Sequence, residues 1–237
     1  MTNQTIEISR RTAAIIAGLS ILILTLAAGF AYGYVFNQLV VPGNATETAN
    51  NIKASETLFR AGIFAWLIIL VCDVFAAWGF YIVFQKVNNG LSLLTAWMRL
   101  TYAAILGIAM LNFIFILILI SSETYLTVFE INTLNSQILL SINAFEEMWS
   151  IGLIVFGSHL LTLGYLAFKS NFIPKILGIL VIIGAVGYLI IHIGSLIVPH
   201  FETYKSTIEM IFMFPMIVGE LGLGLWLLFK KNDLINR

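Results

Sequence analysis

Six long and nearly uninterrupted apolar runs constrain the fold of this chain more than any other feature. They cover residues 12–36, 61–84, 91–120, 138–168, 176–198 and 208–229 of 237. Each run is near or above the ~20 residues that an α-helix needs to cross the roughly 30 Å hydrocarbon core of a bilayer. Lipid offers no partner for backbone polar groups, and the runs are continuous rather than alternating, so we expect helices. The sequence predicts an all-α integral membrane bundle of six transmembrane helices, in a single domain over 1–237.

The composition agrees with a membrane protein and excludes some partners. Hydrophobic residues make up 60% of the chain and charged residues only 10%, against about a quarter charged in a soluble domain. The formal net charge is zero, so nothing points to nucleic acid. The expected partner is the lipid bilayer, and a lipidic or small-molecule ligand and the oligomeric state are left open.

The distribution of Lys and Arg predicts the orientation of the chain, since cytoplasmic loops carry the excess of these residues. Six crossings place both termini on one side. Lys53, Arg60 and Lys205 fall toward the opposite side, and one face collects the larger group, which is Arg10, Arg11, Lys86, Lys169, Lys175, Lys230, Lys231 and Arg237. We therefore expect both termini in the cytoplasm and the protein in the cytoplasmic membrane.

Three ionisable side chains lie near the middle of apolar runs: Asp73, His159 and Glu220. A charged residue at the centre of a membrane helix costs roughly 2.5 to 3.5 kcal/mol, whereas one interhelical hydrogen bond returns about 0.6 on average. The two carboxyl groups must therefore be held neutral, or face cations or water. A cluster of the three would satisfy several of these demands together, and Ala76, Ala77 and the glycines around Glu220 would permit close helix approach.

The cluster admits three interpretations. It is structural in a non-enzymatic scaffold, sensor or immunity-type protein, which is the interpretation that we favour. Alternatively it is a proton relay or a small-solute site of a transporter. The third alternative is a zinc or other divalent metal site of an intramembrane hydrolase with a lipidic substrate, because Asp, His and Glu are metal ligands. The sequence does not decide whether the protein is an enzyme, and no catalytic residue is assigned.

Further polar residues are candidates for secondary sites. Arg99 lies about nine residues into the third run and either extends to the headgroups, which we favour slightly, or reaches Asp73. Tyr188 and His192, four apart on the fifth run, form a polar stripe. Glu56 and Arg60 either admit a charged solute or form an exposed ion pair, which we favour. Pro215, about one turn before Glu220, should kink the sixth run.

Two segments between the runs carry recognisable signals. Pro42 and Gly43 predict a turn, followed by Asn44 as the N-cap of a helix that continues into the second run. The segment 121–137 is too polar for a bilayer core and predicts an external loop.

Several strings resemble a prokaryotic membrane family known as domain of unknown function 4386. They are VVPGNATETANNIKASETLFRAG, LVCDV, WMRL, LIVFGSHLLTLGYLAFKSNFIPKILG and GAVGYLI, in the same order over nearly the whole chain. The family shows a Pro-Gly turn, an Ala-Ser-Glu-x-x-Phe-Arg segment, a Gly-x-His in the fourth span and a Pro-x-x-Leu-Gly. The positions that fit its pattern are Pro42, Gly43, Ser55, Glu56, Arg60, Asp73, Arg99, His159, Tyr165, Pro174 and Gly178.

The chain departs from this family pattern at two places. It has Ala65-Trp66 where members often carry an acidic residue, and Glu146-Glu147 where a His-Asp pair is common. The resemblance implies a topology and a set of candidate positions, but no reaction.

Overall fold

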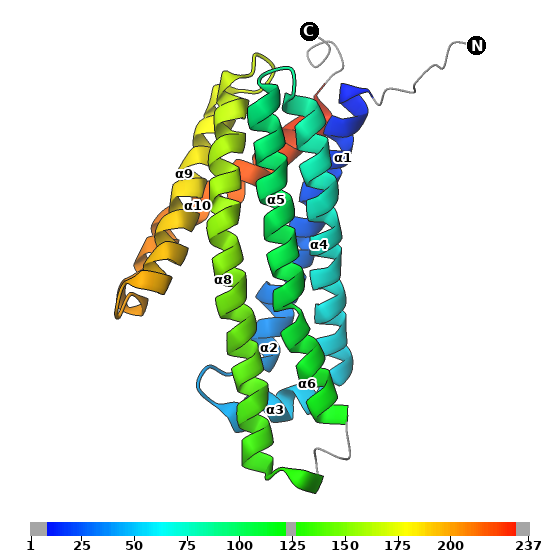
Figure 1. Cartoon of the computed structure of the whole chain (residues 1–237), viewed down its shortest axis with the longest axis vertical. Coiled ribbons are helices and arrows are strands. Elements are labelled where there is room, and N and C mark those ends of the chain that lie inside the picture. The colour runs from blue at the N-terminus through cyan, green and yellow to red at the C-terminus, as the bar shows by residue number, and fades with distance from the viewer. Residues whose placement is uncertain (1–8, 122–126, 231–237) are drawn as a thin grey trace, which may run out of the picture. The chain divides into compact units, whose positions relative to one another are not determined.

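The computed structural model describes residues 9–121 and 127–230, and every regular element in this part of the chain is a helix (Figure 1). Within these residues, six helical segments are long and apolar enough to cross a membrane. The predicted all-α class with six spans is thus confirmed. The helices are α1 Arg10–Ala28, which continues through the π-helix η1 Gly29–Phe36 into α2 Asn37–Leu39, then α3 Ala45–Ala54, α4 Glu56–Phe84, α5 Asn89–Ala109, α6 Leu111–Ser121, α8 Ile131–Lys169, α9 Lys175–Ile197 and α10 Glu202–Phe229.

The described residues divide into two compact units. The first unit comprises 9–22, 72–101 and 153–230, and the second comprises 23–71, 102–121 and 127–152. Four helices, α1, α4, α5 and α8, contribute a segment to each unit. The single domain that the sequence suggests stays a prediction.

Glycines set the close packing of the first unit. A Cβ atom added at Gly18 of α1 would lie 2.5 Å from the carbonyl oxygen of Gly224 on α10. The antiparallel helices α9 and α10 pack in the same way, since a Cβ at Gly184 would lie 2.9 Å from the carbonyl oxygen of Pro215 (Figure 1). Small residues at these points let backbones approach to van der Waals distance, which is how helices associate where lipid supplies no hydrophobic driving force.

Two arginines at the start of α1 form hydrogen bonds with the ends of α4 and α10 in the first unit. Arg10 Nε donates to the carbonyl oxygen of Val83 at 2.7 Å, near the end of α4. Arg11 donates to the carbonyl oxygens of Leu227 and Leu228, each at 2.7 Å, near the end of α10. These last-turn carbonyls have no partner within their own helices. The start of α1 and the ends of α4 and α10 therefore share one face of this unit. Which side of a membrane it faces stays a prediction, and Lys231 and Arg237 lie outside the described residues.

Aromatic side chains form the core of the second unit. The Trp66 ring lies 5.0 Å from both Phe145 and Trp149 by ring centroids, and Phe113 lies 4.2 Å from Phe145. Trp66, one of the residues at which the chain departs from the family pattern, is thus a packing residue here.

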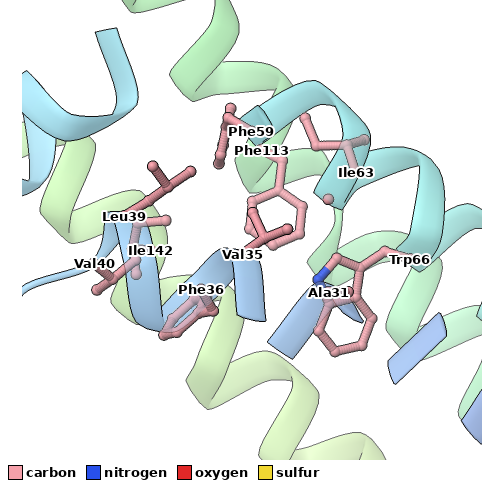
Figure 2. A pocket seen from close by; sticks show the side chains of 11 residues that line it. Ala31, Val35, Phe36, Leu39, Val40, Phe59, Ile63, Trp66, Phe113 and Ile142 are labelled. Carbon is pink, nitrogen blue, oxygen red and sulfur yellow. The ribbon is translucent and has the colours of Figure 1, made fainter. Parts of the chain in front are cut away.

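A small cavity lies beside this aromatic core. Figure 2 shows Val35 of η1 together with Trp66 and Phe113 among its lining side chains. Its volume is about 20 Å³, which is room for about one water molecule. Because the lining is almost entirely apolar and a buried water needs two to four polar partners, this cavity does not suit a ligand.

The predicted turn and cap are confirmed, but the helix after them does not continue into the second span. Gly43 has a φ of +75°, which suits glycine at the third position of a type II turn. The Asn44 side chain accepts a hydrogen bond from the backbone N–H of Glu47. The helix α3 then ends at Ala54, and Ser55, with φ −126° and ψ 42°, separates it from α4.

The third and fourth spans also differ from the expected helices. The third is interrupted at Met110, where the Asn112 side chain donates to the carbonyl oxygen of Ala109 at 2.9 Å. The fourth begins at Ile131 rather than 138, so the predicted loop 121–137 is too long, and residues 122–126 of it lie outside the described part. With 39 residues, α8 measures about 58 Å, which exceeds a hydrocarbon core of roughly 30 Å and accommodates a polar first part.

The contact of Gly18 with α10 predicts a position-specific effect of adding one methyl group. Gly18→Ala should destabilise the protein by about 1 to 3 kcal/mol, because the new Cβ meets backbone that cannot move independently. Gly29→Ala is the matched control, since nothing lies within 4 Å of its added Cβ. Thermal unfolding of both variants in mild detergent measures the difference. Equal midpoints would contradict the packing of α1 on α10.

Candidate functional site

Arg99 of α5 is the centre of a buried ion cluster in the first unit. Its side chain has no solvent exposure. Arg99 Nε donates to Asp73 Oδ1 of α4 at 2.9 Å, and Nη2 lies 2.7 Å from the same oxygen. Arg99 Nη1 donates to Glu220 Oε1 of α10 at 2.5 Å. One guanidinium therefore makes ion pairs with two carboxylates from two other helices.

His159 of α8 completes the cluster as a neutral side chain. Its Nδ1 lies 2.8 Å from the carbonyl oxygen of Thr95, which can only accept, so Nδ1 carries the hydrogen. Its Nε2 lies 3.1 Å from Arg99 Nη1, which can only donate, so Nε2 accepts. These two partners assign one neutral tautomer, and both ring nitrogens are used.

Aromatic rings enclose the guanidinium. Arg99 Cζ lies 5.6 Å from the centroid of Phe80 and 5.4 Å from that of Phe156. A desolvated cation over an aromatic face gains about 2 kcal/mol. Arg99 Nη2 has no aligned hydrogen-bond acceptor within the described residues, so its contact with Asp73 is electrostatic. The cluster is thus a cation held by charges and ring faces in a site from which water is largely excluded.

Local sequence patterns explain how four helices reach this cluster. Thr95 and Arg99 are four apart and share one face of α5, so one helix supplies both the cation and the carbonyl for His159. Ala76 and Ala77, about one turn after Asp73, are fully buried. Gly219, beside Glu220, lets α10 approach the backbone of Leu180, which would lie 3.0 Å from an added Cβ.

The structure brings the three predicted intramembrane residues together, but around a cation that the sequence interpretation placed elsewhere. The preferred prediction, that Arg99 extends to the headgroups, is wrong. Two carboxylates in a medium of low dielectric attract the guanidinium strongly, and this attraction opposes the tendency of an arginine to extend to the interface. Phe80 and Thr95 were not predicted. Phe156 lies on the same stripe of the fourth run as His159, three residues before it, and Thr95 precedes Arg99 by four, so spacing is the signal for these two residues.

Arg99 contacts one atom of each member of the trio, and these atoms, Asp73 Oδ1, Glu220 Oε1 and His159 Nε2, are of the kinds that bind metal ions. No group of three His, Cys, Asp or Glu residues in 9–121 and 127–230 has a geometry that could hold a metal ion. The physical reason is that the guanidinium itself supplies the positive charge that Asp73 and Glu220 require. Zinc at Asp73, His159 and Glu220 would first have to displace Arg99.

The remaining candidates form two other pairs, one on α9 and one on α4. Tyr188 stacks on His192 with ring centroids 6.0 Å apart, as the predicted stripe on α9 requires, and it packs edge-on against Phe156 at 5.3 Å. Glu56 and Arg60 form an i,i+4 ion pair at 2.7 Å, with side chains 42% and 53% exposed. That geometry agrees with an exposed surface pair.

Comparison with known proteins gives a family but no activity. The family described as "Domain of unknown function (DUF4386)" matches residues 16–230. An uncharacterized protein of Archaeoglobus fulgidus is 31% identical over 173 residues, which cover 73% of this chain and 83% of that protein. No solved structure matches the chain significantly.

The cluster predicts that removal of Arg99 destabilises the protein mainly because Asp73 and Glu220 then remain buried without a cation. Arg99→Gln should destabilise the protein by about 3 to 5 kcal/mol, the usual cost of breaking a buried ion pair. Adding Asp73→Asn and Glu220→Gln to Arg99→Gln should recover part of this loss, because no unpaired charge then remains buried.

Unfolding midpoints in detergent measure these effects. The control is Arg60→Gln, which removes an exposed partner and should cost about 0 to 1 kcal/mol. An Arg99→Gln variant as stable as Arg60→Gln would contradict a buried ion cluster, and so would a triple variant less stable than Arg99→Gln alone.

Proposed function

The chain belongs to the DUF4386 family, and we propose that it is a non-enzymatic membrane protein of the sensor type, in which the Arg99 cluster binds a proton at Glu220. The observation that carries this proposal is the pairing of one buried guanidinium with two carboxylates beside a neutral histidine. Binding of the proton changes how α10 is held against α5.

The charge count of the cluster supports a proton-binding role. Two ionised carboxylates against one guanidinium leave one uncompensated negative charge, because His159 is neutral. A net charge inside a membrane bundle is costly. One bound proton makes the cluster neutral while it leaves one complete ion pair in place.

The difference in exposure between the carboxylates supports Glu220 as the proton site. The Glu220 side chain is 12% exposed, whereas that of Asp73 is 2% exposed and makes two contacts with Arg99. Glu220 pairs with the Arg99 guanidinium of α5, which also contacts Asp73 of α4 and His159 of α8. Glu220 is therefore the more accessible of the two carboxylates, and Asp73 is the one that the guanidinium holds by two contacts.

The sequence of α10 supports this helix as the responding element. Pro215 lies inside it, five residues before Glu220. Proline lacks the N–H that would bond to the preceding turn, so the helix is weakened at this point. When Glu220 is protonated, the ionic attraction between α10 and Arg99 is lost and only a neutral hydrogen bond can remain.

The hydrogen bonds that Ser158 and His159 already make also favour a non-enzymatic protein over a hydrolase. The Ser158 hydroxyl donates to the carbonyl oxygen of Ile154 at 3.1 Å, and His159 uses both ring nitrogens within the cluster. Adjacent residues of a helix point about a hundred degrees apart, so these two do not form a nucleophile and base pair.

A pulsed electron paramagnetic resonance experiment tests the sensor directly. Spin labels at Leu94 of α5 and Ile217 of α10, both exposed, report the distance between these helices in a Cys72→Ala background. Acidification should shift the distance, and Glu220→Gln should hold it at the acidic value at every pH.

Glu209→Gln is the control for this experiment, because Glu209 is exposed on the same helix. A distance that does not respond to pH would overturn the proposal. A pH-dependent distance in Glu220→Gln would also overturn the proposal.

A proton-coupled transporter is the second candidate, favoured by the same partly buried Glu220 on a proline-containing helix. Proton flux into proteoliposomes distinguishes the two. A sensor should show a pH-dependent distance without flux, whereas flux abolished by Glu220→Gln would assign transport.

We further propose that the protein lies in the cytoplasmic membrane with both termini in the cytoplasm. The cations at the start of α1 and near the ends of α8 and α10 support this orientation under the positive-inside rule.

Cysteine labelling tests the orientation in the Cys72→Ala background. A membrane-impermeant maleimide should label Thr46→Cys on intact cells, and Asn171→Cys only after permeabilisation, since both positions are exposed. The reverse pattern would invert the topology.

A further inference from the structure

The second unit carries an open apolar groove with a cation at one end. It has a volume of about 420 Å³, within the roughly 300 to 1,000 Å³ of typical ligand pockets. From α4 it is lined by Arg60, Ile63, Phe64, Leu67 and Leu70. From α5, the interruption at Met110 and α6 it is lined by Gly107, Met110, Leu111, Ile114 and Leu117. Arg60 is the single charged residue among the described residues that line it.

The groove exists because side-chain volume is missing between these helices. Gly107 has no side chain, and a Cβ there would meet only Leu70 Cδ1, at 3.0 Å. The helix is also interrupted next to it, since α5 ends at Ala109 and α6 begins at Leu111. The Asn112 side chain satisfies the carbonyl of Ala109, so the interruption leaves no unpaired carbonyl at that residue.

The length and polarity of the groove match one leaflet of a bilayer. Arg60 and Leu70 are ten residues apart on α4, which corresponds to about 15 Å of helix. Half of a hydrocarbon core of roughly 30 Å is also about 15 Å. Arg60 directly precedes the apolar run 61–84, where cations meet lipid headgroups. The exposed side chains in between are apolar, with Phe64 at 63% and Leu111 at 52% exposure.

We infer that this groove binds a phospholipid, with one acyl chain between α4 and α6 and the phosphate on Arg60. Charge complementarity selects the headgroup, since a guanidinium matches phosphate oxygens in charge and geometry. The Arg60 side chain is 53% exposed and holds only the exposed carboxylate of Glu56, so its remaining N–H groups can reach a phosphate. The apolar lining of the groove selects the acyl chain of the lipid.

Lipid retention measured by native mass spectrometry tests this inference on the full-length protein. The purified protein is delipidated in mild detergent and titrated with phosphatidylglycerol, or with a diacylglycerol of the same chains that lacks the phosphate. We expect saturable binding of phosphatidylglycerol and about tenfold weaker binding of diacylglycerol. Equal binding of both, or binding of neither, would overturn the proposal.

Two variants with matched controls assign the binding to the groove. Arg60→Gln should weaken phosphatidylglycerol binding about tenfold, whereas Lys53→Gln removes a cation outside the groove and should leave the binding unchanged. Gly107→Leu places a side chain into the groove and should also weaken the binding. Gly33→Leu, with nothing within 4 Å of the added Cβ, should not. Unchanged binding in both Arg60→Gln and Gly107→Leu would show that the lipid binds elsewhere.

Discussion

The charge of Arg99 inside an apolar bundle is the constraint on which the first unit depends. A guanidinium removed from water is stable only where carboxylates and acceptors surround it, and Asp73, Glu220 and His159 supply these from three other helices. Each carboxylate depends equally on the cation. These contacts span only a few ångströms, so they require helices that approach closely. The glycine and alanine contacts of α1, α9 and α10 meet that requirement.

Each unit is stabilised internally by a different kind of interaction. The first unit combines buried ion pairs with contacts between helix backbones. The second relies on the aromatic packing of Trp66, Phe113 and Phe145, and its ion pair of Glu56 and Arg60 is exposed to solvent. Ionic interactions respond to protons and aromatic packing does not. The proton-dependent function that we propose rests on the first unit, and the lipid binding that we infer rests on the groove of the second.

Much of the fold could be predicted from the sequence because the bilayer imposes one dominant requirement, namely that each span be an apolar helix long enough to cross the hydrocarbon core. Apolar length alone indicates the six spans, and Pro42, Gly43 and Asn44 indicate a turn and a cap through local backbone chemistry. The interruptions at Ser55 and Met110 and the π-helix η1 could not be predicted in this way. At Met110 the Asn112 side chain bonds to the carbonyl oxygen of Ala109, while the apolar pattern continues on both sides.

The sequence by itself determined that Asp73, His159 and Glu220 need partners, because an isolated charge in an apolar span is too costly to leave unpaired. It also offered Arg99 as one partner, without deciding between Asp73 and the headgroups. Only the tertiary structure decided that the guanidinium lies among all three and that His159 is neutral with both nitrogens bonded. The reason is that a sequence gives the depth of a residue along its helix, whereas the rotation and neighbours of that helix come from packing over the whole bundle.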